Sequence, residues 1–249
     1  MDAREYFDVT AEFYDAQYGA DQGGDREFYR ELAVEADGPV LEVGCGTGRI
    51  YLDLLRAGVD ADGIDVSEKM LAVLREKAAE EGLDPWVWHT DVTDFEPPRE
   101  YALAIIPFRA FLHLLTAEEQ LSALANLHDA LEPGGRLALN FFVPNPEVVE
   151  AYYGDWREEA IVYEGREYTL RTLTELENPV EGIVHERREL YDPDGERVFD
   201  AAYTLKWLPK REFELLARLS PFEEWEVYGD FEWDPLESAD QEQVWILKR

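Results

Sequence analysis

The sequence predicts an α/β fold in which a parallel, doubly wound sheet carries an inserted antiparallel sheet after its fifth strand. Between residues 40 and 143, apolar runs alternate with segments of helical period, as they do in successive strand–helix–strand units. A turn with three glycines, Gly44 to Gly48, follows the first apolar run. Between residues 156 and 208 the apolar period becomes two residues, which indicates antiparallel strands.

The parallel strands are expected at short apolar runs, namely residues 40–43, 61–66, 86–89, 102–106 and 136–143. The helices between them are expected at residues 47–57, 68–82 and 116–131. Ser67 and Thr116 are placed to cap two of these helices, and Glu119 completes a capping box with Thr116. The run at 102–106 is almost entirely apolar, as a central parallel strand should be.

The first 37 residues place tyrosine and phenylalanine side chains among charged ones. We expect two helices here, separated by a glycine-rich break at Gly19 to Gly24. Tyr14 and Tyr18 are four residues apart, so they share one face of a helix. That face packs into the core or lies over a bound ligand.

The inserted sheet is expected to have strands at residues 160–163, 168–177, 183–191 and 198–207. Asp192 to Gly195 has the composition of a turn between the last two. The chain then returns to a helix at 210–219 and to closing strands at 225–228 and 244–248. With 249 residues and a hydrophobic content of 46%, it is one large domain or a domain with an insertion.

The composition is strongly acidic, with 56 acidic against 23 basic residues and a formal net charge of −33. A nucleic-acid substrate is disfavoured, because phosphate contacts need lysine and arginine side chains. An acidic, lysine-poor surface on an ordinary core resembles that of halophilic proteins. We expect its self-repulsion to be screened only at high salt.

No apolar run reaches the roughly eighteen residues that a membrane span needs, and no basic segment followed by an apolar stretch opens the chain. The only cysteine, Cys45, lies in the glycine turn and cannot form an internal disulfide, which suits a reducing compartment. These features predict a cytoplasmic protein with no membrane partner. No cluster of His, Cys or Asp residues has the spacing of a metal site, so no metal is expected.

The glycine turn predicts a nucleoside cofactor. Glycines let a ligand lie against the backbone, and Asp65 at the end of the second strand is placed to accept hydrogen bonds from ribose hydroxyls. The dinucleotide fingerprint requires a third glycine where this chain has Arg49. Glu42 would also place a carboxylate near a pyrophosphate, so the turn suits a cationic ligand better.

Four segments carry a resemblance to a known family. They are Leu41–Gly48, Gly63–Ser67, His89–Val92 and Leu131–Leu137, in the family's order and at its spacing. On these segments, over residues 38 to 143, the chain resembles the class I S-adenosylmethionine-dependent methyltransferases. The resemblance implies a Rossmann-like, seven-stranded sheet, S-adenosylmethionine as the cofactor and S-adenosylhomocysteine as its product.

The resemblance also divides the chain into parts. Residues 1–37 would form a helical lid, 38–150 the cofactor-binding core, 151–208 the inserted sheet, and 209–249 the completion of the core sheet. The inserted sheet would cover the substrate or make a dimer contact, so a homodimer is left open. Candidate substrate residues in it are Arg171, Tyr203, Lys206 and Trp207, each of which can equally be ordinary sheet surface.

The family's cofactor contacts map mostly onto the loops that follow the parallel strands. The cofactor-binding residues that the resemblance implies are Tyr14, Glu42, Gly44, Cys45, Gly46, Thr47, Gly48, Asp65, Val66, Met70, Asp91, Val92, Pro107 and Phe108. Asp65 would bind the ribose, and Asp91 would accept from the adenine amino group. For each the simpler role stays open, a helix-capping acid for Asp65 and a turn residue for Asp91.

The loop after residue 106 lacks the polar residue of the Asn/Asp-Pro-Pro-aromatic motif that DNA amino-methyltransferases carry there. Arg109 could bind a carboxylate or phosphate of a substrate. His113 could act as a general base, because an unperturbed histidine has a pKa of about 6.5, or could only pack at a helix start.

Together these features predict an enzyme that methylates nitrogen or oxygen of a small molecule by direct displacement. The methyl group on a sulfonium is already activated, so alignment matters more than acid–base catalysis. Two alternatives stay open, a methyltransferase for protein side chains and a protein that binds S-adenosylmethionine without catalysis.

Overall fold

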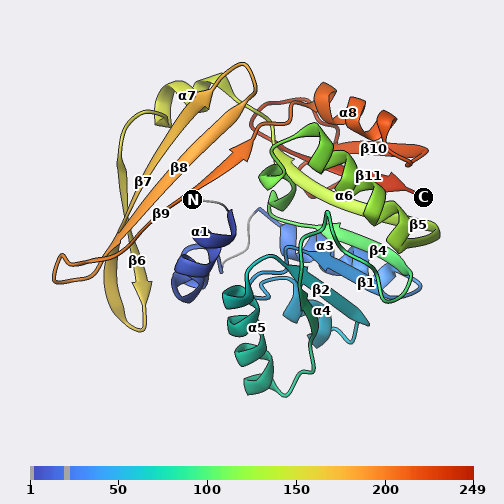
Figure 1. Cartoon of the computed structure of the whole chain (residues 1–249), viewed down its shortest axis with the longest axis horizontal. Coiled ribbons are helices and arrows are strands. Elements are labelled where there is room, and N and C mark those ends of the chain that lie inside the picture. Colours follow the sequence, from blue (N-terminus) through green and yellow to red (C-terminus); the bar gives the residue numbers. More distant parts are fainter. Residues whose placement is uncertain (1–2, 20–22) are drawn as a thin grey trace.

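A seven-stranded sheet forms one half of the molecule, in a computed structural model that describes residues 3–19 and 23–249 (Figure 1). Its strands are β1 (Val40–Val43), β2 (Ala61–Asp65), β3 (Trp86–His89), β4 (Tyr101–Ile106), β5 (Leu131–Phe142), β10 (Glu224–Gly229) and β11 (Glu242–Lys248). The spatial order is β10-β11-β5-β4-β1-β2-β3, with β1 to β5 parallel and the pairs β11–β5 and β10–β11 antiparallel. The predicted Rossmann-like, doubly wound sheet is confirmed.

Helices cover both faces of this sheet, because alternate strand residues point to opposite faces. On one face α3 (Asp25–Glu35), α4 (Tyr51–Arg56) and α5 (Glu68–Glu81) pack against side chains such as Val40 and Ile105. On the other face α6 (Ala117–Ala130) and α8 (Lys210–Leu219) pack against side chains such as Leu41 and Ala104. The strand order reverses at β1, so the loops after β1 and β4 diverge there and leave room for a ligand.

The predicted inserted sheet is also confirmed. It contains β6 (Arg157–Tyr163), β7 (Arg166–Asn178), β8 (Ile183–Tyr191) and β9 (Arg197–Lys206), paired antiparallel in that order. The helix α7 (Pro146–Tyr152) leads into it from β5. One face of this sheet packs on the N-terminal segment, through side chains that include Tyr6, Phe13 and Leu190.

The N-terminal segment lies between the two sheets, with α1 (Ala3–Thr10) beside the inserted sheet and α5 (Figure 1). It continues through a 3₁₀ turn, η1 (Ala11–Phe13), and α2 (Tyr14–Tyr18). The described residues before 40 therefore hold three α-helices and a 3₁₀ turn, whereas two helices were expected. Part of the break expected at Gly19 to Gly24, residues 20–22, lies outside the described residues.

Several element boundaries differ from those expected. The helix expected from residue 47 begins at Tyr51, because Gly48 has a φ of 87°, which no helix continues through. Strand β5 begins before Gly134 and Gly135, with residues 132–135 looped out where the β4–β5 register shifts. Helix α7 was not expected, although Asn145 caps it and Pro146 stands at its first position, a recognised helix start.

Two predicted caps are present. The Ser67 hydroxyl accepts from the Met70 amide, and Thr116 and Glu119 form the reciprocal capping box of α6. These caps fix where α5 and α6 begin, and so where the loops before them end. Helix α5 also ends as glycine-terminated helices do, with Gly82 at a φ of 70°.

Candidate functional site

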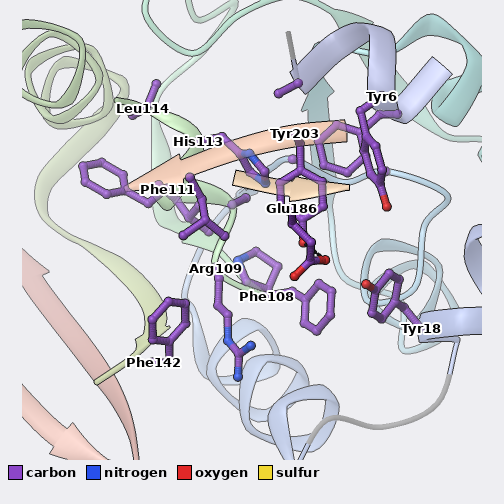
Figure 2. Close-up of a pocket in the computed structure, with 18 of the residues that line it drawn as sticks. Tyr6, Tyr18, Phe108, Arg109, Phe111, His113, Leu114, Phe142, Glu186 and Tyr203 are labelled. Carbon is purple, nitrogen blue, oxygen red and sulfur yellow. Dashed lines mark hydrogen bonds between the residues drawn. The ribbon is translucent and has the colours of Figure 1, made fainter. Parts of the chain in front are cut away.

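A cavity of about 1040 Å³ lies at the carboxyl ends of the parallel strands and extends under the inserted sheet (Figure 2). This volume is large enough for a nucleoside cofactor together with a second small molecule. Of the sixteen site residues expected from the sequence, the cavity is lined by Tyr14, Glu42, Gly44, Cys45, Gly46, Thr47, Asp65, Val66, Met70, Asp91, Val92, Pro107, Phe108, Arg109 and His113. Residues at or after the ends of four parallel strands, together with Tyr14 of α2, are thus brought to one place, as expected at this edge of the sheet.

Gly48 is the exception among them and does not line the cavity. A Cβ atom there would lie 2.8 Å from Cγ of Leu52 and 2.9 Å from Cγ of Leu74, so this glycine serves helix packing. Gly44 and Gly46 have φ values of 71° and 53° and turn the backbone along the cavity wall. Their amides bond inward, Gly44 to the Ile64 carbonyl and Gly46 to Asp65.

Glu42 is buried beneath the glycine turn at 2% exposure, and its Oε2 atom has no hydrogen-bond partner among the described residues. Burial raises the pKa of this carboxyl well above its usual range, against the opposing charge of Arg49. Arg49 itself is held by a buried ion pair with Asp25, 2.5 Å between Nη2 and Oδ2. A buried carboxylate oxygen without a donor is costly unless a ligand supplies one, and an ammonium group would do so.

Asp65 is the last residue of β2, and Asp91 lies two residues after the end of β3. The Asp65 carboxylate accepts from the backbone amides of Gly46 and Ser67, both at 2.8 Å, which fixes its orientation. Burial raises its pKa to about 6, against these two hydrogen bonds. Asp91 accepts through Oδ1 from the amide and hydroxyl of Thr93, so it is a turn residue as well as a cavity residue.

The loop after β4 holds two consecutive non-glycine residues in the left-handed region, Phe108 at a φ of 52° and Arg109 at 66°. Asn140 supports this turn by accepting from the Phe108 amide at 3.0 Å. Arg109, expected to bind a substrate anion, is instead ion-paired with Glu242 and stacks over Phe142. Its charge is therefore already compensated within the described residues.

His113 lies in η2 (Ala110–His113), at the boundary between the two sheets. Its Nδ1 lies 3.3 Å from the Thr204 carbonyl oxygen, which can only accept, so Nδ1 carries the hydrogen and Nε2 is left as an acceptor. Burial lowers the pKa of this histidine to about 4, so the ring is neutral at pH 7. It packs edge-on against Phe7 and Tyr203.

Of the four candidate substrate residues in the inserted sheet, Tyr203 and Trp207 line the cavity and the other two do not. Arg171 pairs with Glu158 and Glu189 on the far face, and Lys206 pairs with Glu212. Glu186 and Arg188, which were not predicted, also line the cavity as a buried ion pair. The sequence did contain a signal for these two residues. In β8 they share one face with the apolar residues Val184 and Leu190, so a strand there places two charged side chains on the buried face.

The N-terminal segment closes the cavity on the remaining side. The Ser67 hydroxyl donates to Asp8 at 2.6 Å, and the Thr47 hydroxyl donates to Asp15 at 2.6 Å. Lys77 adds an ion pair to Asp15. These contacts join the segment to the loop after β1 and to the start of α5.

Comparison with known proteins identifies the core. Residues 40–135 match a family model described as a methyltransferase domain. An uncharacterized methyltransferase of Staphylococcus carnosus is 31% identical over 134 residues, which cover 49% of this chain and 61% of that protein. Over 118 residues the chain is 30% identical to the dTDP-3-amino-3,4,6-trideoxy-alpha-D-glucopyranose N,N-dimethyltransferase of Streptomyces venezuelae, covering 47% of this chain and 48% of that protein.

Residues 40–135 therefore form a methyltransferase domain, and the chain as a whole has the fold of S-adenosylmethionine-dependent methyltransferases.

The fold likeness extends beyond the matched core. The CcbJ methyltransferase of Streptomyces caelestis superimposes with a TM-score of 0.82 and 24% sequence identity, over 99% of this chain and 98% of that one. The inserted sheet and the N-terminal segment therefore belong to an architecture that this methyltransferase fold shares. The sequence matches, in contrast, span about half to three fifths of the relatives' lengths.

S-adenosylmethionine, the cofactor of these methyltransferases, fits the residues of the glycine-turn side. Its ammonium can donate to the unpartnered, buried Oε2 of Glu42. Asp65 is oriented to accept from ribose hydroxyls, because each of its oxygens keeps a second acceptor position beside the amide that it binds. No group of three or more His, Cys, Asp or Glu residues suited to a metal occurs within residues 3–19 and 23–249. The same residues contain no helix with the length and apolarity of a membrane span.

Proposed function

We propose that this protein transfers the methyl group of S-adenosylmethionine to a small-molecule acceptor held beneath the inserted sheet. The observation that supports this most directly is the single cavity that runs from the glycine turn to β8 and β9. Its first half carries Glu42 and Asp65, and its second half carries Glu186, Tyr203 and other side chains that no cofactor role accounts for. The sulfonium supplies an activated methyl group when the cofactor is bound.

The residues of the chain would mainly orient the acceptor and exclude water. Tyr18 and Phe108 pack edge to face, with 5.2 Å between their ring centres, in the cavity wall where its two halves meet. The lid contacts of Asp8 and Asp15 keep the cofactor side closed. His113, being neutral, presents Nε2 as an acceptor that can take a hydrogen bond from the acceptor molecule.

We infer that the methylated atom is a nitrogen of an amine. An amine reacts as its free base: the ammonium form releases one proton to solvent before the reaction, and the nitrogen lone pair then attacks the methyl carbon as the carbon–sulfur bond breaks. A hydroxyl must instead lose its proton during the reaction to a base of suitable pKa. The histidine on the acceptor side has a pKa of about 4, which makes it a weak base for a hydroxyl. The Streptomyces venezuelae relative is, by its name, an N,N-dimethyltransferase for an amino sugar, which agrees with an amine acceptor.

A protein side chain is a less suitable acceptor, because the lid and the inserted sheet leave a cavity of small-molecule size. Calorimetric titration should show binding of S-adenosylmethionine and no comparable binding of NAD. Incubation with methyl-labelled cofactor and a set of amino sugars, matched to the parent sugars, should label an amino sugar. Label on protein alone would favour the protein methyltransferase, and binding without any label would favour a non-catalytic binding protein.

A further inference from the structure

Glu186 is a charged residue on a face of the inserted sheet that is otherwise largely apolar. Along β8, Val184, Glu186, Arg188 and Leu190 alternate with residues of the outer face and point toward the cavity and the N-terminal segment. The Glu186 and Arg188 side chains are 12% and 11% exposed, and their charges are 2.6 Å apart. An apolar pair would fold at least as well in such a place, so the ion pair calls for a functional explanation.

The donors around Glu186 are unevenly divided between its two oxygens. Oε1 accepts from the Tyr203 hydroxyl at 2.6 Å and from Nε of Arg188 at 2.7 Å, with Nη2 of Arg188 also beside it. Oε2 accepts only from the Thr174 hydroxyl, at 3.1 Å, among the described residues. A carboxylate oxygen accepts two hydrogen bonds in its plane, so Oε2 can take one more donor.

The surroundings of this carboxylate favour a cation. Figure 2 shows Glu186 directed into the space between the rings of Tyr203, Phe108 and Tyr18. Aromatic faces attract cations, and Arg188 already uses the Tyr18 ring in this way at 5.0 Å. Burial alone would raise the pKa of Glu186, but the charge of Arg188 and the Tyr203 hydrogen bond hold it below its usual value, so the group is ionised at pH 7.

We propose that Glu186 is the residue that binds the amino group of the acceptor, through a hydrogen bond to Oε2, within the ring box of Tyr18, Phe108 and Tyr203. This assignment rests on the proposed methyl transfer to an amine and adds the residue that selects the amine. Arg188 offers no free charge to an anionic acceptor, because it is already neutralised by Glu186 and also donates to Gln17. An amine that binds as its ammonium loses one proton to solvent before methyl transfer, and an N–H of the free base can still donate to Oε2 while its lone pair attacks the methyl carbon. The products are S-adenosylhomocysteine and a methylated ammonium, which the same carboxylate would stabilise.

The test compares binding of cyclohexylamine and of its hydroxyl counterpart, cyclohexanol, to protein loaded with S-adenosylhomocysteine. Titrations in about 1 M KCl screen the nonspecific attraction of an amine to an acidic protein. We expect the wild-type protein to bind the amine about tenfold more tightly than the alcohol. The variant Glu186→Gln should lose this preference while its affinity for S-adenosylhomocysteine stays unchanged.

Two further variants separate binding from structure. Glu186→Gln alone leaves Arg188 unpaired, and its charge would repel an amine, so the double variant Glu186→Gln/Arg188→Met restores the net charge of the cavity. This double variant should also bind cyclohexylamine no more tightly than cyclohexanol. Glu189→Gln, which removes a buried carboxylate from the outer face of the same strand, should still bind the amine more tightly.

The proposal is overturned if the wild-type protein shows no preference for the amine, or if the double variant retains the preference. Because the readout is probe binding, it does not depend on turnover. Failure of methyl transfer in the labelling experiment is therefore distinguishable from failure of the Glu186 assignment. Thermal unfolding of each variant with and without S-adenosylhomocysteine shows that it is folded.

Discussion

At the scale of single residues, the cofactor side depends on two buried carboxyl groups whose environments differ. Glu42 is held under the glycine turn with one oxygen unpartnered, whereas Asp65 has a backbone amide on each oxygen. Burial raises the pKa of both. Each group should therefore couple cofactor binding to pH in its own way.

For Glu42 we expect cofactor binding to release a proton. The carboxyl has a pKa raised well above its usual value in the free protein, and a nearby ammonium would lower that pKa, so the proton leaves on binding. Calorimetry at pH 7.5 in two buffers of different ionisation enthalpy measures the release. Glu42→Gln should abolish it and weaken binding by about tenfold or more. The exposed control Glu223→Gln should behave as wild type, and buffer-independent heats for the wild-type protein would contradict the assignment.

For Asp65 we expect affinity for S-adenosylmethionine to rise with pH through about 6, where the carboxyl ionises and becomes able to accept from two hydroxyls. At pH 5 the ionised fraction is roughly a tenth, so binding should be about tenfold weaker than at pH 8. Asp65→Asn should bind the cofactor weakly, and its affinity should lack the rise through about pH 6. Titrations of both proteins across pH 5 to 8 measure this rise, and the same pH profile in the variant as in the wild-type protein would refute the role of Asp65 in binding the ribose.

At the scale of elements, the strained turn after β4 is held by residues of three distant elements. Asn140 in β5 accepts from the Tyr29 hydroxyl of α3 at 2.8 Å and from the Phe108 amide at 3.0 Å. Its amide nitrogen donates to Glu242 of β11, which pairs with Arg109. This network is buried, with Asn140 at 3% exposure and Tyr29 at 0%. It keeps the Phe108 ring at the junction of the two cavity halves.

Replacing Asn140 by Leu should therefore destabilise the protein by about 2–4 kcal/mol, since it leaves the Tyr29 hydroxyl and the Phe108 amide buried without a partner. Urea unfolding measures the change. Tyr29→Phe removes one of these bonds without leaving a buried donor and should cost only about 1 kcal/mol. Equal stability of Asn140→Leu and wild type would show that the turn is held by other contacts.

At the scale of the whole molecule, the net charge of −33 governs behaviour in salt. Ion pairs such as Arg99 with Asp60 and Asp62 offset some of the repulsion, but basic residues are too few to pair with all 56 acids. The remaining repulsion falls as the Debye length shrinks to about 3 Å at 1 M salt. The predicted halophilic character rests on this excess of acidic over basic residues.

We expect the melting temperature to rise by at least about 5 °C between about 0.1 and 2 M KCl. Scanning fluorimetry across the series measures it. An uncharged osmolyte at matched osmolality serves as the control, because it strengthens burial without screening charge. A melting temperature that does not change with KCl, or that rises equally with the osmolyte, would reject charge screening as the cause.

The sequence alone determined the parallel core and most of the cofactor side, because both depend on local patterns. Strand periodicity, the capping residues Ser67 and Thr116, and the glycine turn each act over a few neighbouring residues. Parallel topology then brings strand ends together at one edge of the sheet, so the strand pattern is sufficient to place Asp65 and Asp91 beside Gly44.

Only the tertiary structure decided which side chains are already engaged and which face the cavity. Arg109 pairs with Glu242, which is too far away in the sequence for a local pattern to predict the contact. Gly48 leaves space for the side chains of Leu52 and Leu74 and does not line the cavity. The proposed role of Glu186 also depends on contacts between distant segments, because Tyr18 of the N-terminal segment and Phe108 of the core line the same cavity. Contacts of this kind arise when separate elements pack, because burial and hydrogen-bond capacity are properties of the assembled surroundings and not of a segment.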